Sequence, residues 1–314
     1  MALSATDMEK PAYTVALCTH NHLDRLRRTL VDLAAIASPR AAWELLIVDN
    51  GCSDGTTEFL ASNQWSQPVA SVRVVREDTL GLSHARNRAI AEAAGDYIIF
   101  IDDDETPDAN WLCAYERCIE REHPDAMGGA IDVLFVDGDR PAWLQDELLG
   151  FIGKLSHGAE ARALTETSTP IFGGNFGFRK ATFERIGRFD IGLGRRGTAN
   201  IGGEDTEIYR RLLTAQLKVW WVPESVIYHR IESVKLRRRY FLDLHFHQGR
   251  MEGVRTRGTR SCMPPKYLFG QLYRAVRAAW TQRRHQGSDY SLRLEMNFAY
   301  FVGYILGWTR GTRP

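Results

Sequence analysis

Three adjacent aspartates, Asp102, Asp103 and Asp104, and then Glu105 come directly after an apolar run at residues 97–101. Carboxylates this close repel one another and raise one another's pKa, and a hard divalent cation relieves the repulsion. Mg²⁺ and Mn²⁺ typically bind one or two carboxylates together with the phosphate oxygens of a substrate. Alternate residues of an extended chain point to the same side, so Asp102 and Asp104 are expected to face one site. A solvated acidic loop or the first turn of a helix is the alternative interpretation.

The segments around these carboxylates alternate between apolar runs, which predict buried strands, and helical patterns. We expect strands at residues 13–19, 43–49, 72–76, 97–101, 126–135, 172–179 and 219–222, and helices at residues 24–36, 56–63, 83–94, 111–121 and 206–215. This alternation is typical of an α/β fold with a mostly parallel, Rossmann-like central sheet flanked by helices. Ligands bind beyond the carboxyl ends of the strands in such sheets. Asp49 and Asp102 both stand at predicted strand ends, so we expect the site at this edge.

The composition is that of an ordinary globular protein, with 314 residues, 44% hydrophobic and 25% charged, and a formal net charge of +1. We expect a flexible N-terminus at residues 1–12, one large domain at residues 13–232 and a helical extension at residues 233–314. The near-neutral charge and the lack of a recognition motif argue against a nucleic-acid partner. The five cysteines form no C-x-x-C pair. No signal peptide or long apolar run is found, and together these features predict a cytoplasmic protein.

The C-terminal part is rich in basic and aromatic residues, as in the segment 235–241 (KLRRRYF). Helical patterns are expected at residues 267–284 and 290–308. Basic and aromatic side chains suit an anionic interface, so one interpretation is peripheral contact with the inner, cytoplasmic face of a membrane. The other is that these helices pack on the large domain and that their arginines form a solvated face. The sequence supports both interpretations.

Three segments in a fixed order carry a family resemblance. The first is residues 48–56 (VDNGCSDGT), the second is residues 81–88 (GLSHARNR) leading into 95–104 (GDYIIFIDDD), and the third is residues 202–205 (GGED). Together they resemble the inverting family-two glycosyltransferases with the GT-A fold, over roughly residues 13–229. The resemblance implies a metal-dependent transfer of a sugar from a nucleotide diphosphate donor, by default a UDP-sugar. The implied acceptor is a hydroxyl of a glycan or of a polyprenyl-linked or other lipid-linked glycan, as in polysaccharide assembly for the cell envelope.

The resemblance implies a nucleotide-binding group made of Thr19, Asn21, Asp49, Arg86, Asp102 and Asp103. Within this group, Asp49 accepts a hydrogen bond from a uracil-like base, and Asp102 lies near the ribose and the metal. Asp49 also suits a capping role in the turn after its strand, with the backbone N–H of Gly51 or Ser53 as the donor. Arg86 has an alternative role as well, in an ion pair with the acidic cluster.

Metal binding is implied for Asp104, which bridges to the diphosphate, and for His229. Asp103 occupies the variable position of the family's D-x-D motif. An imidazole ligand is more compatible with Mn²⁺ than with Mg²⁺, so manganese is the expected cofactor.

The resemblance makes Asp205 the general base, with Glu204 beside it to hold the acceptor. A base is required because a sugar hydroxyl must lose its proton as it attacks the anomeric carbon. Attack from the face opposite the departing diphosphate inverts the anomeric centre. Capping of the helix at residues 206–215 is the alternative role, since the helix dipole favours carboxylates at an N-terminus.

Gly173, Gly174 and Asn175 are implied to line the donor sugar and the acceptor, although a tight turn explains the same residues. Trp143 lies in a long unassigned segment, residues 137–170, and either stacks on a sugar ring or is buried. Long unassigned segments are often functional loops. We expect this segment or residues 190–201 to order over the donor and exclude water.

Two rival functions share some of these features. A nucleotidyltransferase that makes nucleotide sugars has a similar α/β frame and an acidic metal site, but the chain lacks a Gly-rich basic phosphate loop near its N-terminus. A non-catalytic scaffold for glycan assembly is the second rival. The complete set of Asp102, Asp104, Glu204, Asp205 and His229 argues against it.

Overall fold

The computed structural model describes residues 10–62, 65, 71–171, 173–194, 203–257 and 263–310. The chain divides into two compact units. The first comprises the described residues of Met1–Asp132 and Lys154–His229, and the second those of Val133–Gly153 and Arg230–Pro314. One boundary between the units lies near residue 230, where the sequence analysis placed it at 232. Residues 133–153 belong to the second unit, whereas the sequence analysis placed them in the large domain.

Nine described strands form one sheet in the order β3-β2-β1-β4-β8-β6-β9-β5, with β7 paired to β9. Their bounds are β1 Tyr13–Thr19, β2 Trp43–Asp49, β3 Val72–Arg76, β4 Tyr97–Asp102, β5 Glu105–Pro107, β6 Ala126–Phe135, β7 Arg162–Ala163, β8 Phe176–Arg179 and β9 Val219–Ile231. The pairings of β3, β2, β1 and β4 are parallel, whereas β8 is antiparallel to both β4 and β6. The expected α/β fold with parallel central strands is confirmed.

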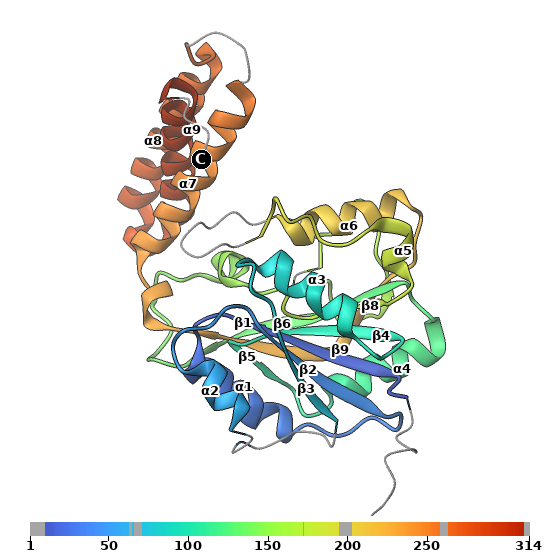
Figure 1. The fold of residues 1–314 in the computed structure, drawn as a ribbon. Helices are drawn as coiled ribbons and strands as arrows, with labels where there is room; N and C mark the ends of the chain where they lie inside the picture. Colours follow the sequence, from blue (N-terminus) through green and yellow to red (C-terminus); the bar gives the residue numbers. More distant parts are fainter. Residues whose placement is uncertain are drawn as a thin grey trace, which may run out of the picture. The chain divides into compact units, whose positions relative to one another are not determined.

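The strands β1 and β2 are buried along their whole length, which is why they read as continuous apolar runs. The helices of the first unit are α1 Leu23–Ala34, α2 Thr56–Ala61, α3 Leu82–Glu92, α4 Trp111–Glu122, α5 Thr182–Ile186 and α6 Glu204–Thr214. Figure 1 shows α1, α2 and α4 on one face of the sheet and α3, α5 and α6 on the other. In α1 the buried Leu26, Leu30 and Leu33 recur at helical spacing and form the face that packs on the core.

The structure corrects three predicted boundaries. β9 continues to Ile231, nine residues beyond the end of the strand predicted at 219–222, and β8 begins at Phe176. Helix α6 begins at Glu204, two residues before its predicted start, so both acidic residues belong to its first turn. The start of the predicted strand at residue 172 and the start of the GGED motif at Gly202 lie outside the described residues.

Five phenylalanines from β4, β8, α5 and the segment after α5 form an aromatic cluster. Phe100 of β4 stacks on Phe176 of β8 with ring centroids 5.0 Å apart, and the rings of Phe178, Phe183 and Phe189 lie edge-on or tilted around them. Aromatic pairs in these geometries stabilise a core beyond their buried area. This cluster supports the side chain of Arg86, whose guanidinium lies over the rings of Phe176 and Phe189.

The second unit contains three long helices, α7 Arg238–Arg257, α8 Lys266–Gln286 and α9 Leu292–Arg310, with short 3-10 helices at Asp146–Ile152, Ser233–Lys235 and Ser288–Tyr290. The helical extension and its two predicted helices are confirmed, and α7 adds a third. A side-chain carbon on Gly249 or Gly253 of α7 would overlap the α9 backbone, and one on Gly303 or Gly307 of α9 would overlap the α7 backbone. The two helices therefore pack with their backbones in close approach. Among the described helices, none is long and apolar enough to cross a membrane.

Candidate active site

The carboxyl ends of β1, β2 and β4 bring the predicted site residues together. In the parallel register, Thr19 is paired with Asp49, and Cys18 is paired with Asp102. The expectation that Asp49 and Asp102 share one sheet edge is confirmed. A pocket lies at this edge, lined by Cys18, Thr19, His20, His22, Arg25, Asn50, Leu80, Gly81, Leu82, Ala85, Asp102, Asp103 and Asp104.

Asp103 is a buried residue of the pocket lining. Its carboxylate accepts a 2.6 Å hydrogen bond from the Thr19 hydroxyl and lies 3.1 Å from Nδ1 of His22. Burial raises the pKa of Asp103, although the His22 ring opposes this effect. The contact with Asp103 in turn raises the pKa of His22. Thr19 and Asp103, both predicted to bind nucleotide, thus bind each other and fix the turn that presents Asp102 and Asp104.

Asp104 and His229 lie next to each other, although 125 positions separate them in the chain. The distance from Oδ2 of Asp104 to Nε2 of His229 is 3.4 Å. The antiparallel register of β5 and β9 creates this contact, because it pairs Glu105 with His229. Within the described ranges, no group of three or more His, Cys, Asp or Glu side chains is arranged to hold a metal ion. A cation here would therefore take these two protein ligands and complete its shell with phosphate oxygens and water, as Mg²⁺ and Mn²⁺ commonly do.

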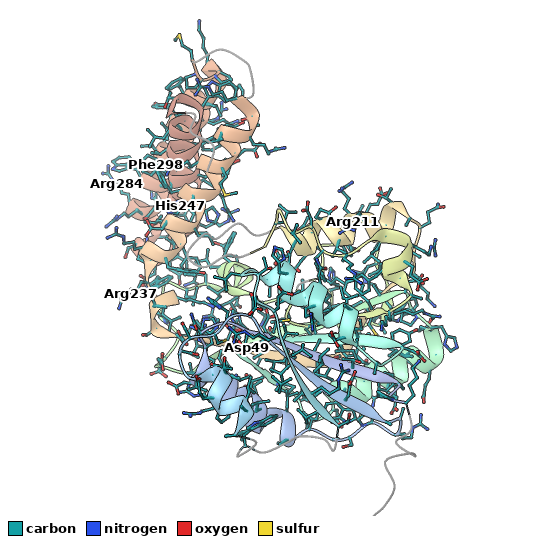
Figure 2. All side chains as sticks on the ribbon, in the orientation of Figure 1. Asp49, Arg211, Arg237, His247, Arg284 and Phe298 are labelled. Carbon is teal, nitrogen blue, oxygen red and sulfur yellow. The ribbon has the colours of Figure 1, made fainter. Side chains whose placement is uncertain are left out.

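Asp49 lies at the end of β2 (Figure 2), and both oxygens of its carboxylate accept hydrogen bonds from nearby residues. One oxygen accepts a 2.9 Å hydrogen bond from the N–H of Cys52, and the other accepts a 2.6 Å bond from the hydroxyl of Thr57. Burial raises its pKa, but these hydrogen bonds outweigh burial and lower the pKa overall. The turn-capping role is therefore present, with Cys52 as the donor in place of the expected Gly51 or Ser53.

Arg86 is 2% exposed and lies among three carboxylates. Its guanidinium is 2.9 Å from Asp205, 3.4 Å from Glu204 and 3.5 Å from Asp102. Burial by itself lowers the pKa of Arg86, but the three carboxylates outweigh it and raise the pKa, so the group is charged. The ion pair with the acidic cluster considered for Arg86 is present at Asp102, and the two shorter contacts are to carboxylates of α6, which the sequence did not predict. This side chain links Asp102 at the end of β4 with the start of α6.

Asp205, at 22%, and Asp102, at 36%, are the partly exposed carboxylates of this network. Its Oδ2 accepts a 2.9 Å hydrogen bond from the backbone N–H of Gly173. Burial raises its pKa to about 6, helped by the charges of Glu204 and Asp102 and opposed by Arg86. A carboxylate with this pKa accepts a proton more readily than an ordinary aspartate. In Glu204, the buried atom Oε2 has no hydrogen-bond partner among the described residues.

Gly173 and Gly174 are needed for close packing beneath the site. A side-chain carbon on Gly173 would overlap the guanidinium of Arg86, and one on Gly174 would overlap the carboxyl of Glu105. Glu105 also accepts a 2.9 Å hydrogen bond from the backbone N–H of Asp102. Burial, then the charges of Asp102 and Asp104, raise its pKa well above the usual value. No role was assigned to Glu105 from the sequence, although it stands in the acidic motif.

The Asn175 side chain lies inside the core of the first unit, and Trp143 lies in the second unit. The Asn175 side chain is fully buried, accepts hydrogen bonds from Trp111 and Tyr115, and donates to two backbone carbonyls. Both polar atoms of its amide are hydrogen-bonded inside the core, so Asn175 stabilises the fold around the site. Trp143 belongs to the second unit, where it packs edge-on against Phe241.

The loop after β1 and the first turn of α1 supply pocket residues that the sequence analysis missed. His20, His22 and Arg25 line the pocket, and Arg25 lies 4.0 Å from Asp104. The predicted residue Asn21 has a positive φ of 55° and accepts a hydrogen bond from the N–H of Ser53. The signal for the missed residues was their position directly after a strand that runs parallel to the Asp49 and Asp102 strands.

Comparison with known proteins agrees with this geometry. The family model described as Glycosyl transferase family 2 matches residues 14–187, which is more than half of the chain. The chain therefore belongs to this glycosyltransferase family.

Individual relatives are distant. Glycosyltransferase AglE of Haloferax volcanii is 28% identical over 133 residues, 42% of this chain and 43% of AglE. Succinoglycan biosynthesis protein ExoM of Rhizobium meliloti is 23% identical over 241 residues, 76% of this chain and 73% of ExoM. The chain thus spans less than half the length of AglE and of several other curated relatives that it matches.

Solved structures share the fold. Mannosyltransferase PcManGT from Pyrobaculum calidifontis, solved with GDP-Man and Mn²⁺, has a TM-score of 0.59 at 16% identity, covering 94% of this chain and 86% of that one. GalNAc-T7, solved with UDP, GalNAc and Mn²⁺, has a TM-score of 0.54 at 20% identity, covering 72% of this chain and 45% of that one. At these identities the likeness shows the fold alone, which is the expected GT-A type.

Proposed function

We propose that this chain is a metal-dependent, inverting glycosyltransferase that moves a sugar from a nucleotide diphosphate donor to a hydroxyl acceptor. The proposal rests on two carboxylates in different surroundings, one beside a histidine and the other beside a buried arginine. Asp104 lies beside His229 at the strand ends, while Asp205 lies beyond Arg86 with a raised pKa. A donor site and a proton acceptor side by side are what glycosyl transfer to a hydroxyl requires.

Asp205 is the proposed base. Its partly exposed carboxylate is held in place by the Arg86 guanidinium and the N–H of Gly173, so it keeps one orientation. A pKa near 6 leaves it ionised at neutral pH and able to take the proton of an attacking hydroxyl. The adjoining Glu204, which lies 3.4 Å from the same guanidinium, is proposed to hold the acceptor.

The residues at the strand ends fit a bound Mn²⁺ or Mg²⁺. Asp104 and His229 supply an oxygen and a nitrogen donor, a pair more compatible with manganese, and two solved neighbours contain Mn²⁺. When bound, the cation would neutralise the developing charge of the leaving diphosphate. Asp103, Thr19 and Glu105 keep the turn that carries Asp102 and Asp104 in one shape.

For the nucleotide of the donor and for the acceptor, we propose a chemical class. A UDP-sugar is the default donor, and a glycan or lipid-linked glycan on the cytoplasmic side is the proposed acceptor. The relative ExoM, named for succinoglycan biosynthesis, supports a role in polysaccharide assembly. Because the solved neighbours hold UDP in one case and GDP-Man in another, the nucleotide must be tested directly.

The first experiment is calorimetric binding of UDP, GDP and TDP with and without Mn²⁺, on the unmodified protein and on Asp104→Ala. We expect one nucleotide to bind in a metal-dependent way and the variant to weaken this binding by about tenfold or more. Asp96→Ala is the matched control, because Asp96 is exposed and precedes β4 at the opposite end of that strand.

The same experiment separates the rival functions. If none of the three nucleotides binds under any metal condition, the transferase proposal fails in favour of a non-catalytic scaffold. Release of pyrophosphate from a nucleoside triphosphate and a sugar phosphate would instead identify a nucleotidyltransferase.

A further inference from the structure

The outward face of α8 carries a stripe of large apolar side chains. Phe269, Tyr273, Val276 and Trp280 follow one another at intervals of four, three and four residues, which places them on one side of a helix. Their exposed fractions are 51%, 67%, 45% and 61%. The stripe is about 16 Å long at 1.5 Å per residue. Large apolar side chains aligned and exposed in this way mark an interaction surface.

This stripe is not the face that holds α8 in its unit. Leu268 and Ala275 are the buried residues of α8, and Leu268 packs with Tyr304 and Trp308 of α9. The helix therefore has two apolar faces, one packed against α9 and one open to solvent. A helix that needed only to pack on its neighbours would require the first face alone.

The charges of α8 are all of one sign. The helix contains four arginines and one lysine, Lys266, Arg274, Arg277, Arg283 and Arg284, and no acidic residue. At 100° per residue, Lys266, Arg277 and Arg284 fall along one edge of the apolar stripe. Arg283 falls along the other edge, where it lies 4.0 Å from Glu295 of α9. The guanidinium of Arg284, which projects from the helix in Figure 2, lies 5.3 Å from the ring centroid of Trp280. Cationic groups thus border the exposed rings.

We propose that the α8 face binds the surface of an anionic lipid bilayer. In this arrangement the helix lies in the plane of the interface. The rings of Phe269, Tyr273 and Trp280 enter the headgroup region, and the bordering arginines meet anionic headgroups. Each basic side chain near such a surface contributes attraction that weakens with salt. An anionic bilayer surface therefore complements both the apolar stripe and the cationic edges of the α8 face.

The charge pattern argues against a second copy of the chain as the occupant. Two α8 faces brought together by a two-fold axis would oppose five cations with five cations, without an acidic residue on either helix. A nucleic acid would use the arginines but would leave Val276 and much of the apolar stripe without a partner. A bilayer interface accepts both features at once.

The test is sedimentation of the full chain with vesicles of phosphatidylcholine alone or with phosphatidylglycerol added. We expect binding to the anionic vesicles only, and a steep loss of binding as salt is raised. The double variants Tyr273→Ser/Trp280→Ser and Arg277→Glu/Arg284→Glu should each lower the partition coefficient about tenfold or more. Both pairs are exposed, and circular dichroism verifies that each variant is folded.

Matched controls come from the first unit. Val31 is 61% exposed on α1 and Arg210 is 70% exposed on α6, so Val31→Ser and Arg210→Glu make the same kinds of change elsewhere. Neither should alter vesicle binding. Asp104→Ala should also bind vesicles normally, so failure of this surface proposal is distinguishable from failure of the proposed enzymatic function.

Several outcomes would overturn the proposal. These are no binding to anionic vesicles at low salt, equal binding to neutral vesicles, or full binding by both α8 double variants. A dimer or an RNA complex that α8 variants abolish, with no vesicle binding by the unmodified chain, would assign the face to that other partner.

Discussion

The strand-end site and the α8 face use charge in opposite ways. In the site, Arg86 is almost fully buried among Asp205, Glu204 and Asp102, so charges of both signs lie within hydrogen-bond distance or close to it. On α8, five cations are exposed without an acidic residue on the helix. A buried charge is tolerated only with partners in good geometry, whereas an exposed one is hydrated and screened by salt. In the strand-end site, stability therefore depends on the position of individual atoms. On the α8 face, binding depends on the total charge.

The largest effect is expected from Arg86→Met, which removes the buried cation and leaves its three carboxylates unpaired. Breaking a buried charge pair from one side costs about 3–5 kcal/mol of folding free energy. Urea unfolding measures the change. Arg88→Met on the same helix is the control, because Arg88 is 41% exposed and pairs with Glu92; we expect a loss below about 1 kcal/mol. Equal losses in the two variants would contradict the contrast between buried and exposed charge.

A smaller effect is expected from Gly173→Ala. The added carbon would overlap the guanidinium of Arg86, so either the loop or the ion pair must shift. Overpacking of this kind costs about 1–3 kcal/mol. Gly270→Ala on α8 is the matched control, since nothing lies within 4 Å of its added carbon; there we expect stabilisation of roughly 0.5–1 kcal/mol. Unfolding curves that rank the two variants in the reverse order would show that the site is not tightly packed.

The third prediction concerns the protonation of Asp205 and is measured on the transfer rate, with no loss of folding stability expected. A base must be unprotonated to act, and burial raises the pKa of Asp205 to about 6. The transfer rate should therefore be constant above this value and fall as the pH falls through it, by about tenfold per pH unit well below it. The measurement is kcat/KM against pH, with the donor and metal saturating. Asp205→Asn should lack activity across the range while still binding nucleotide, and full activity in that variant would remove Asp205 from the mechanism.

The sequence by itself determined the parallel strands of the sheet and the sheet edge at which the acidic residues lie. Apolar runs such as 43–49 and 97–101 are local signals, because a parallel strand buried on both faces needs apolar residues throughout. Parallel strands end at the same edge of a sheet, so the joint location of Asp49 and Asp102 followed from those runs alone. The helices α8 and α9 were likewise predictable from their periodic patterns. Helix α7 was not predicted, because two of its buried positions are the glycines Gly249 and Gly253.

Only the tertiary structure decided which polar groups bind each other. The partners of Arg86 on α6 lie 118 and 119 positions away in the chain, and nothing local distinguishes them from other carboxylates. Asn175 is part of the core because Trp111, Tyr115 and two backbone carbonyls surround its amide, a result of how β8 packs on its neighbours. Trp143 and residues 133–153 joined the second unit in the same way. Periodicity is a property of neighbouring residues, whereas a buried polar group is satisfied by whichever distant partners the fold brings to it.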